Sequence, residues 1–218
     1  MKKQNLLEII EKGENLTCEF KRKFSTHEKI AKEMIAFANT KGGTIFFGVD
    51  DDKEIIGVES EKAEAELIEE AAKDYCAPPL KYKIEFIGIK GKEIVAVNIP
   101  ESDNKPHRLQ DYSNDFDITK AVVTIRVNDK SIQASKEMIR LLKAESGNMK
   151  LKKYSIGANE KNVFAYLEKN ETITVKALSE LVNISTRRAS RTLVKMVRAN
   201  LLMIHTKENG EEYFTSRA

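Results

Sequence analysis

The spacing of apolar residues divides the first 145 residues into helices and strands. Helical spacing of apolar positions predicts four helices, whereas alternation or a short continuous apolar run predicts strands. Ser25, with Glu28 three positions later, is predicted to cap the second helix. The predicted helices cover residues 5–12, 26–41, 61–75 and 135–144, and the predicted strands cover residues 16–21, 44–49, 54–58, 80–89, 93–99 and 121–127. This interleaving predicts an α/β or α+β domain around a mixed sheet.

The last third of the chain has a different pattern, with three short helices followed by a hairpin. The turn Asn183-Ile184-Ser185 gives the last two helices helix-turn-helix spacing, and Asn209-Gly210 favours a two-residue hairpin turn. The predicted helices cover residues 160–169, 175–182 and 186–200, and the predicted strands cover residues 202–207 and 211–216. This order resembles a winged helix.

Two domains are therefore expected. The first covers residues 1–145, a polar linker covers residues 146–154, and a small winged helix-turn-helix domain covers residues 155–218.

Basic residues are concentrated in the second domain. Residues 151–218 contain 12 Lys and Arg against 7 Asp and Glu, a net charge of +5, and residues 1–150 contain 25 against 27, a net charge of −2. The third helix of this domain carries Arg187, Arg188, Arg191, Lys195 and Arg198 around its apolar positions. Arginine can contact both phosphates and guanine edges, so these residues are candidates for nucleic-acid binding. Winged helices also serve as protein-interaction modules, and a basic helix face is often only solvated.

Acidic residues near the first strands are candidates for a metal site. Glu19 and Lys21 are predicted to share the outward face of the strand at residues 16–21, opposite the core-facing positions. Glu14, Glu19 and one of Asp50 or Asp51 are the candidate ligands for Mg2+ or Mn2+, with Lys21 as a further catalytic candidate. Such a site would require a bend after Gly13. The alternative is that residues 50–53 form only a turn, in which Asp is favoured, and from the residues alone this alternative is preferred.

A family resemblance changes that balance. The run AFANTKGGTIFFGVDDDKEIIGV resembles the core motif of the Schlafen AlbA-type domain family, and GENLTCEFK resembles its opening strand with Glu. Weaker similarity continues through NIPESDNKPH and VVTIRVND, so the resemblance covers about residues 1–130. It implies a nucleic-acid-binding protein. In animal members, three acidic residues form a divalent-metal endoribonuclease site that acts on transfer and ribosomal RNA, whereas many microbial members are described as regulators or ATP-binding proteins.

Other features exclude some classes of protein. There is no GxxxxGK[ST] or GxGxxG motif, so Gly42-Gly43 more simply marks a backbone turn, and ATP binding is only a third hypothesis. Cys18 and Cys76 lack the spacing of a zinc site or disulfide framework. No apolar run is long enough to cross a membrane and no signal-peptide pattern is present, so a cytoplasmic protein without a membrane partner is expected.

Two functions remain open. One is a DNA-binding, transcriptional-regulator-like protein that needs no cofactor. The other is a Mg2+- or Mn2+-dependent endoribonuclease that acts on structured RNA such as tRNA through Glu14, Glu19 and Asp50. A homodimer is expected in either case, because the chain has one copy of the motif and animal members are implied to close a groove with two related lobes.

Overall fold

The computed structural model describes residues 3–112, 121–146 and 154–217. It divides into two compact units, Met1–Gln133 and Ala134–Ala218. The boundary lies before the last helix assigned to the first domain, α4 (Lys136–Ser146). This helix belongs to the second unit, where Arg140 Nη1 donates to Ser190 Oγ at 2.6 Å. The expected boundary after residue 145 is therefore not where the chain divides.

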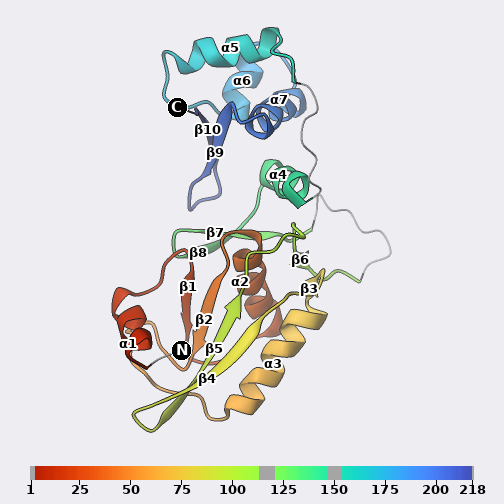
Figure 1. The fold of residues 1–218 in the computed structure, drawn as a ribbon. Helices are drawn as coiled ribbons and strands as arrows, with labels where there is room; N and C mark the ends of the chain where they lie inside the picture. The colour runs from red at the N-terminus through yellow and green to blue at the C-terminus, as the bar shows by residue number, and fades with distance from the viewer. Residues whose placement is uncertain (1–2, 113–120, 147–153, 218) are drawn as a thin grey trace. The chain divides into compact units, whose positions relative to one another are not determined.

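Unit 1 contains a four-stranded mixed sheet, as expected (Figure 1). Its strand order is β1-β2-β5-β4, and only β1 and β2 are parallel. Their bounds are β1 (Cys18–Lys21), β2 (Gly43–Phe47), β4 (Lys83–Ile89) and β5 (Lys92–Ile99). The central strand β2 is buried on both faces: Ile45, Phe46 and Phe47 are all 0–1% exposed. The continuous apolar run in the sequence is explained by this double burial.

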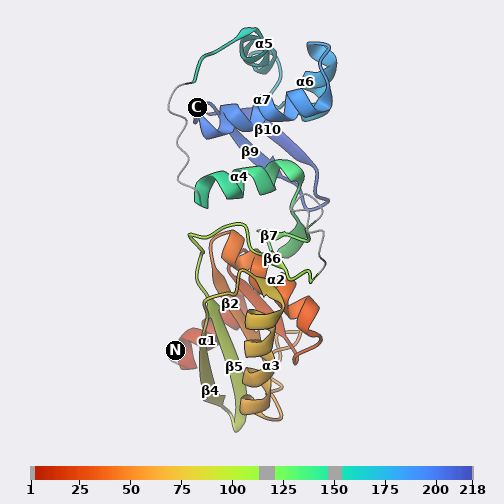
Figure 2. The same cartoon turned by 90° about the vertical axis from the view of Figure 1, so that its right-hand side faces the viewer.

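Helices cover both faces of the sheet (Figures 1 and 2). Helices α2 (His27–Asn39) and α3 (Glu61–Asp74) pack with Ile45 and Phe47 on one face. Helix α1 (Lys3–Lys12) packs with Phe46 on the other face. The amphipathic stripes of these helices thus supply the two layers of core that the sheet requires.

Smaller elements complete unit 1. A hairpin of β7 (Thr124–Val127) and β8 (Lys130–Gln133) contacts α2, and β3 (Cys76–Ala77) pairs with β6 (Arg108–Leu109). Two local expectations were wrong. Residues 54–58 form only an isolated bridge between Val49 and Ile55, and the α2 cap is Thr26, whose Oγ1 accepts from the backbone N–H of Lys29.

Unit 2 contains four helices and a hairpin among its described residues. After α4 come the three short helices and the two strands that the sequence predicts. Their bounds are α5 (Ala158–Leu167), α6 (Val175–Leu181), α7 (Thr186–Arg198), β9 (Leu202–Thr206) and β10 (Glu212–Ser216). Leu178, Leu193 and Phe214, each 0% exposed, lie at the centre of their shared core. No helix in the described part of the chain is long and apolar enough to span a membrane.

Candidate nucleic-acid interface and acidic cluster

The exposed face of α7 is basic. At 3.6 residues per turn, all five predicted basic residues fall within about 100° of the helix circumference. Four are exposed and one, Arg198, is half-buried with a partner of its own. The exposed four are Arg187, Arg188, Arg191 and Lys195. The opposite side of the helix lies in the core of unit 2, so the sequence pattern correctly predicted which side of α7 faces solvent.

The four exposed basic residues line one hollow together with the start of α5. We call this hollow the basic groove. It is lined by Gly157, Ala158, Asn159, Glu160, Ser185, Arg187, Arg188, Arg191, Thr192 and Lys195. Glu160 is the acidic residue in this lining, and its Oε2 accepts a hydrogen bond from the backbone N–H of Gly157 at 3.0 Å. The groove is therefore suited to a polyanion.

The turn between α6 and α7 fixes the start of the basic helix. Asn183 has φ +49°, a left-handed conformation that Asn tolerates better than most residues. Ser179 Oγ donates to the carbonyl of Ile184 at 2.6 Å, and Ser185 Oγ accepts from the backbone N–H of Arg188 at 3.4 Å. These bonds fix the first turn of α7, which carries Arg187 and Arg188, two residues that line the groove.

In unit 1, the expected bend brings Glu14 back toward β1. Gly13 has φ +82°, and Glu14 Oε1 accepts from the backbone N–H of Phe20 at 2.8 Å. Burial raises the pKa of Glu14, the bond from Phe20 lowers it, and the negative charge of Glu19 raises it again, with a net upward shift. The two glutamates thus lie close enough to interact electrostatically.

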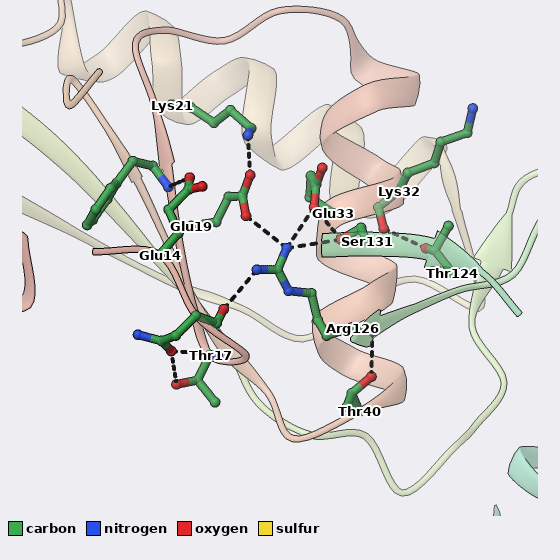
Figure 3. Close-up of polar contacts among 12 residues, drawn as sticks. Glu14, Thr17, Glu19, Lys21, Lys32, Glu33, Thr40, Thr124, Arg126 and Ser131 are labelled. Carbon is green, nitrogen blue, oxygen red and sulfur yellow. Dashed lines mark hydrogen bonds and ion pairs between the residues drawn. The ribbon is translucent and has the colours of Figure 1, made fainter. Parts of the chain in front are cut away.

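Glu19 is buried, contrary to expectation. It lies on the predicted face of β1, opposite Cys18 and Phe20, but it is only 5% exposed. Its Oε2 accepts from Arg126 Nη1 at 2.8 Å, and its Oε1 accepts from Lys21 Nζ (Figure 3). The strand pattern gave the correct face, but the β7–β8 hairpin that covers Glu19 lies more than 100 residues downstream.

Arg126 occupies the centre of the acidic cluster (Figure 3). Its Nη1 also lies 3.3 Å from Glu33 Oε2 and 3.2 Å from Ser131 Oγ, and its Nη2 donates to the carbonyl of Asn15 at 2.8 Å. The guanidinium carbon lies 4.7 Å from the centre of the Phe37 ring. Sequence reasoning missed Glu33, Arg126 and Ser131. The available signal was a single arginine within an apolar strand, which requires a buried partner.

Asp50 does not join this cluster through any contact in the structure. Its Oδ1 accepts from the backbone N–H groups of Asp52 at 3.1 Å and Glu54 at 2.9 Å, which is the turn role that the residues alone favoured. Asp51 is exposed beside it. Within residues 3–112, 121–146 and 154–217, no three or more His, Cys, Asp or Glu side chains are grouped so that they could hold a metal ion. The carboxylate set expected for Mg2+ or Mn2+ therefore does not fit a metal as arranged.

Gly42 and Gly43 are required by close packing. A Cβ on Gly42 would lie 2.7 Å from the backbone N of Glu101, and one on Gly43 would lie 2.4 Å from the Phe37 ring. These approaches explain both glycines without a bound nucleotide.

One family model matches most of the first unit. The family model described as Schlafen, AlbA_2 matches residues 14–135, more than half of the 218 residues. A solved structure of the N-terminal domain of a protein related to the ATP-dependent DNA helicase RecG, from Nitrosomonas europaea, is similar at 21% identity and a TM-score of 0.43, over 52% of this chain and 83% of that one. The DIP2311 protein from Corynebacterium diphtheriae is similar at 18% identity and a TM-score of 0.41, over 56% of this chain and 25% of that one. No curated protein matches the chain. The matched segment contains β1, the Gly42-Gly43 turn and the strand with Arg126, and the chain belongs to the Schlafen AlbA_2 family.

Proposed function

We propose that this protein is a nucleic-acid-binding, transcriptional-regulator-like protein whose unit 2 is a winged helix that reads duplex DNA. Membership of the Schlafen AlbA_2 family indicates nucleic-acid binding. The observation that carries the finer proposal is the basic groove, where Arg187, Arg188, Arg191 and Lys195 are exposed together on one helix.

The physical basis is electrostatic. Lysine and arginine side chains that neutralise phosphates release condensed counterions, so affinity falls steeply with salt. Arginine can also bind O6 and N7 of guanine with two hydrogen bonds, which adds sequence preference. An exposed helix with cations at four neighbouring positions offers both kinds of contact to a major groove.

A homodimer forms part of this proposal. Two related copies of α7 would match the two half-sites of a palindrome, because a two-fold symmetric protein requires a two-fold symmetric site.

The test is a variant with both Arg187→Ala and Arg191→Ala. Alanine favours helix, so α7 should remain folded. Fluorescence anisotropy with labelled duplex DNA, over about 50 to 200 mM salt, should show weaker binding by the variant. The slope of the logarithm of the binding constant against the logarithm of the salt concentration should become shallower by about one unit for each lost phosphate contact. The matched control removes two lysines from the acidic helix α3, Lys62→Ala with Lys73→Ala, and should leave binding unchanged. If the arginine variant binds DNA with unchanged affinity and unchanged salt dependence, α7 is not the helix that contacts the DNA.

The second candidate function is a Mg2+- or Mn2+-dependent endoribonuclease. It is supported by the electrostatic interaction of Glu14 with Glu19 and by the bond from Lys21 to Glu19. The buried partner of Glu19 and the turn role of Asp50 count against it. Labelled transfer RNA should be incubated with the wild type and with Glu14→Gln, with Mn2+ and with EDTA. Cleavage that needs the metal and is lost in Glu14→Gln would favour the nuclease. The absence of cleavage by the wild type would leave the DNA-binding function.

A further inference from the structure

Strand β4 forms an open edge of the unit 1 sheet. Among the described residues it pairs with β5 on one side only, along all seven residues from Lys83 to Ile89. An edge strand presents backbone N–H and C=O groups that can pair with another strand. Its side chains then decide whether a second strand fits.

The side chains of this edge alternate between charge and apolar surface. Lys83 and Glu85 lie on the face that α1 covers, and Lys83 Nζ donates to Glu85 Oε1 at 2.8 Å. Tyr82 and Ile84 pack against the core on the opposite face. Phe86, on that same face, is 52% exposed. The edge therefore combines cationic and anionic groups with an aromatic ring that the unit does not bury.

The sequence of β4, together with Tyr82 just before it, is complementary to itself in one register. If Ile84 lies opposite Ile84 of the partner subunit, each Lys83 faces Glu85 of the partner subunit and each Phe86 faces Tyr82 of the partner subunit. Opposite charges and aromatic pairs across neighbouring antiparallel strands are stabilising, whereas like charges are destabilising. A two-fold axis at Lys83 or Glu85 places like charges opposite each other. An axis at Phe86 places both charges opposite isoleucines.

We propose that two copies of the chain associate through β4, edge to edge and antiparallel, with Ile84 at the two-fold axis. Two four-stranded sheets thereby become one continuous sheet, and each Phe86 ring is covered by the partner subunit's Tyr82. The contact is isologous, as most homodimer interfaces are, and it closes after two subunits. The charged pair of Lys83 and Glu85, at the start of β4, fixes the register. This assignment does not depend on nucleic-acid binding, because none of these residues belongs to the basic groove.

The first experiment is sedimentation equilibrium of the full chain without nucleic acid. The wild type should dimerise at micromolar concentration. Glu85→Lys places ammonium groups opposite each other and should weaken dimerisation by about tenfold or more. Adding Lys83→Glu to that chain restores complementarity and should restore the dimer. The control chain carries Lys62→Glu and Glu66→Lys on α3, which keeps the charge balance and should dimerise as the wild type does.

A mixing experiment tests the register directly. The chain with Lys83→Glu alone has two carboxylates on its edge, and the chain with Glu85→Lys alone has two ammonium groups. Each should be largely monomeric, but their mixture should form a heterodimer, which native mass spectrometry distinguishes by mass. Circular dichroism should confirm that both chains are folded. A monomeric wild type, a dimer insensitive to these charges, or a mixture without heterodimer would each overturn the β4 interface.

Discussion

Arg126 and Glu19 form a buried ion pair, with Nη1 2.8 Å from Oε2 and side chains that are 0% and 7% exposed. Two charges taken out of water need both each other and further hydrogen bonds to balance the cost of desolvation. Lys21 supplies a second cation for Glu19, and Glu33 supplies a second anion for Arg126. The buried pair therefore stabilises the fold of unit 1.

Replacing Arg126 or Glu19 alone should lower the free energy of unfolding strongly. Arg126→Met should lower the free energy of unfolding by about 3–5 kcal/mol, because Glu19 and Glu33 would be left facing each other without their shared cation. Urea unfolding measures this change, with the exposed Arg22→Met as control. Glu19→Gln combined with Arg126→Met should cost clearly less than the sum of the two single changes. Additive costs would show that the two side chains do not depend on each other.

Asp50 should matter for local stability only. Asp50→Ala removes the acceptor of two backbone N–H groups and should cost about 1 kcal/mol or slightly more, whereas Asp50→Asn retains an oxygen acceptor and should be nearly neutral. Both variants should bind nucleic acid as the wild type does. A loss of RNA cleavage in Asp50→Asn, with stability preserved, would contradict the turn role and restore Asp50 as a candidate ligand.

Gly43 should not accept a side chain. Gly43→Ala would place a methyl group against the Phe37 ring and the Thr17 carbonyl, and overpacking of this kind costs about 1–3 kcal/mol. Gly210→Ala is the contrast, since its φ is +84° but nothing lies within 4 Å of the added Cβ. Thermal unfolding should show the larger decrease for Gly43→Ala. Equal or smaller decreases for Gly43→Ala would contradict the close packing, because Gly43, unlike Gly210, does not have a positive φ that would explain a loss of stability.

Glu212 should make stability depend on pH. Burial and the charge of Glu137 raise its pKa to about 7, although a hydrogen bond from Ser135 Oγ at 2.6 Å lowers it. The ordinary pKa of a glutamate is about 4.5, so between pH 4.5 and about 7 the folded chain holds a proton that the unfolded chain releases. The free energy of unfolding therefore falls as pH rises through this range and levels off above 7. The contribution lost should be on the order of 3 kcal/mol.

The comparison that isolates this effect is the wild type against Glu212→Gln, which stays neutral. Urea unfolding at several pH values across this range should show the wild type losing stability relative to the variant as pH rises. Parallel pH profiles would mean that Glu212 titrates alike in the folded and unfolded chain.

Prediction from the sequence was most accurate for elements whose own residue pattern determines which positions are buried and which are exposed. The apolar run of β2 predicted a doubly buried strand, and the spacing in α7 separated buried from exposed positions, because both patterns follow from local geometry alone. The bend after Gly13 was only a requirement of the metal-site hypothesis; the structure has it, with a positive φ that glycine adopts without strain.

The acidic cluster could not be predicted in the same way. Alternation placed Glu19 on the correct face of β1, but its burial depends on Arg126 and Ser131, which reach it only in the folded chain. The division between the two units was missed for a similar reason. The apolar stripe of α4 predicts that this helix packs against something, but only tertiary contacts show that its partner is α7.

The position of Arg126 along the chain also has a consequence during synthesis on the ribosome. Strands β1, β2, β4 and β5 have all been synthesised by Ile99, yet the cation that neutralises Glu19 and Glu33 is added 27 residues later, at Arg126. A nascent chain that has completed its sheet therefore still carries two carboxylates without their arginine. A fragment trimmed to that sheet would have the same defect, so the shortest autonomous version of unit 1 must extend through the β7–β8 hairpin.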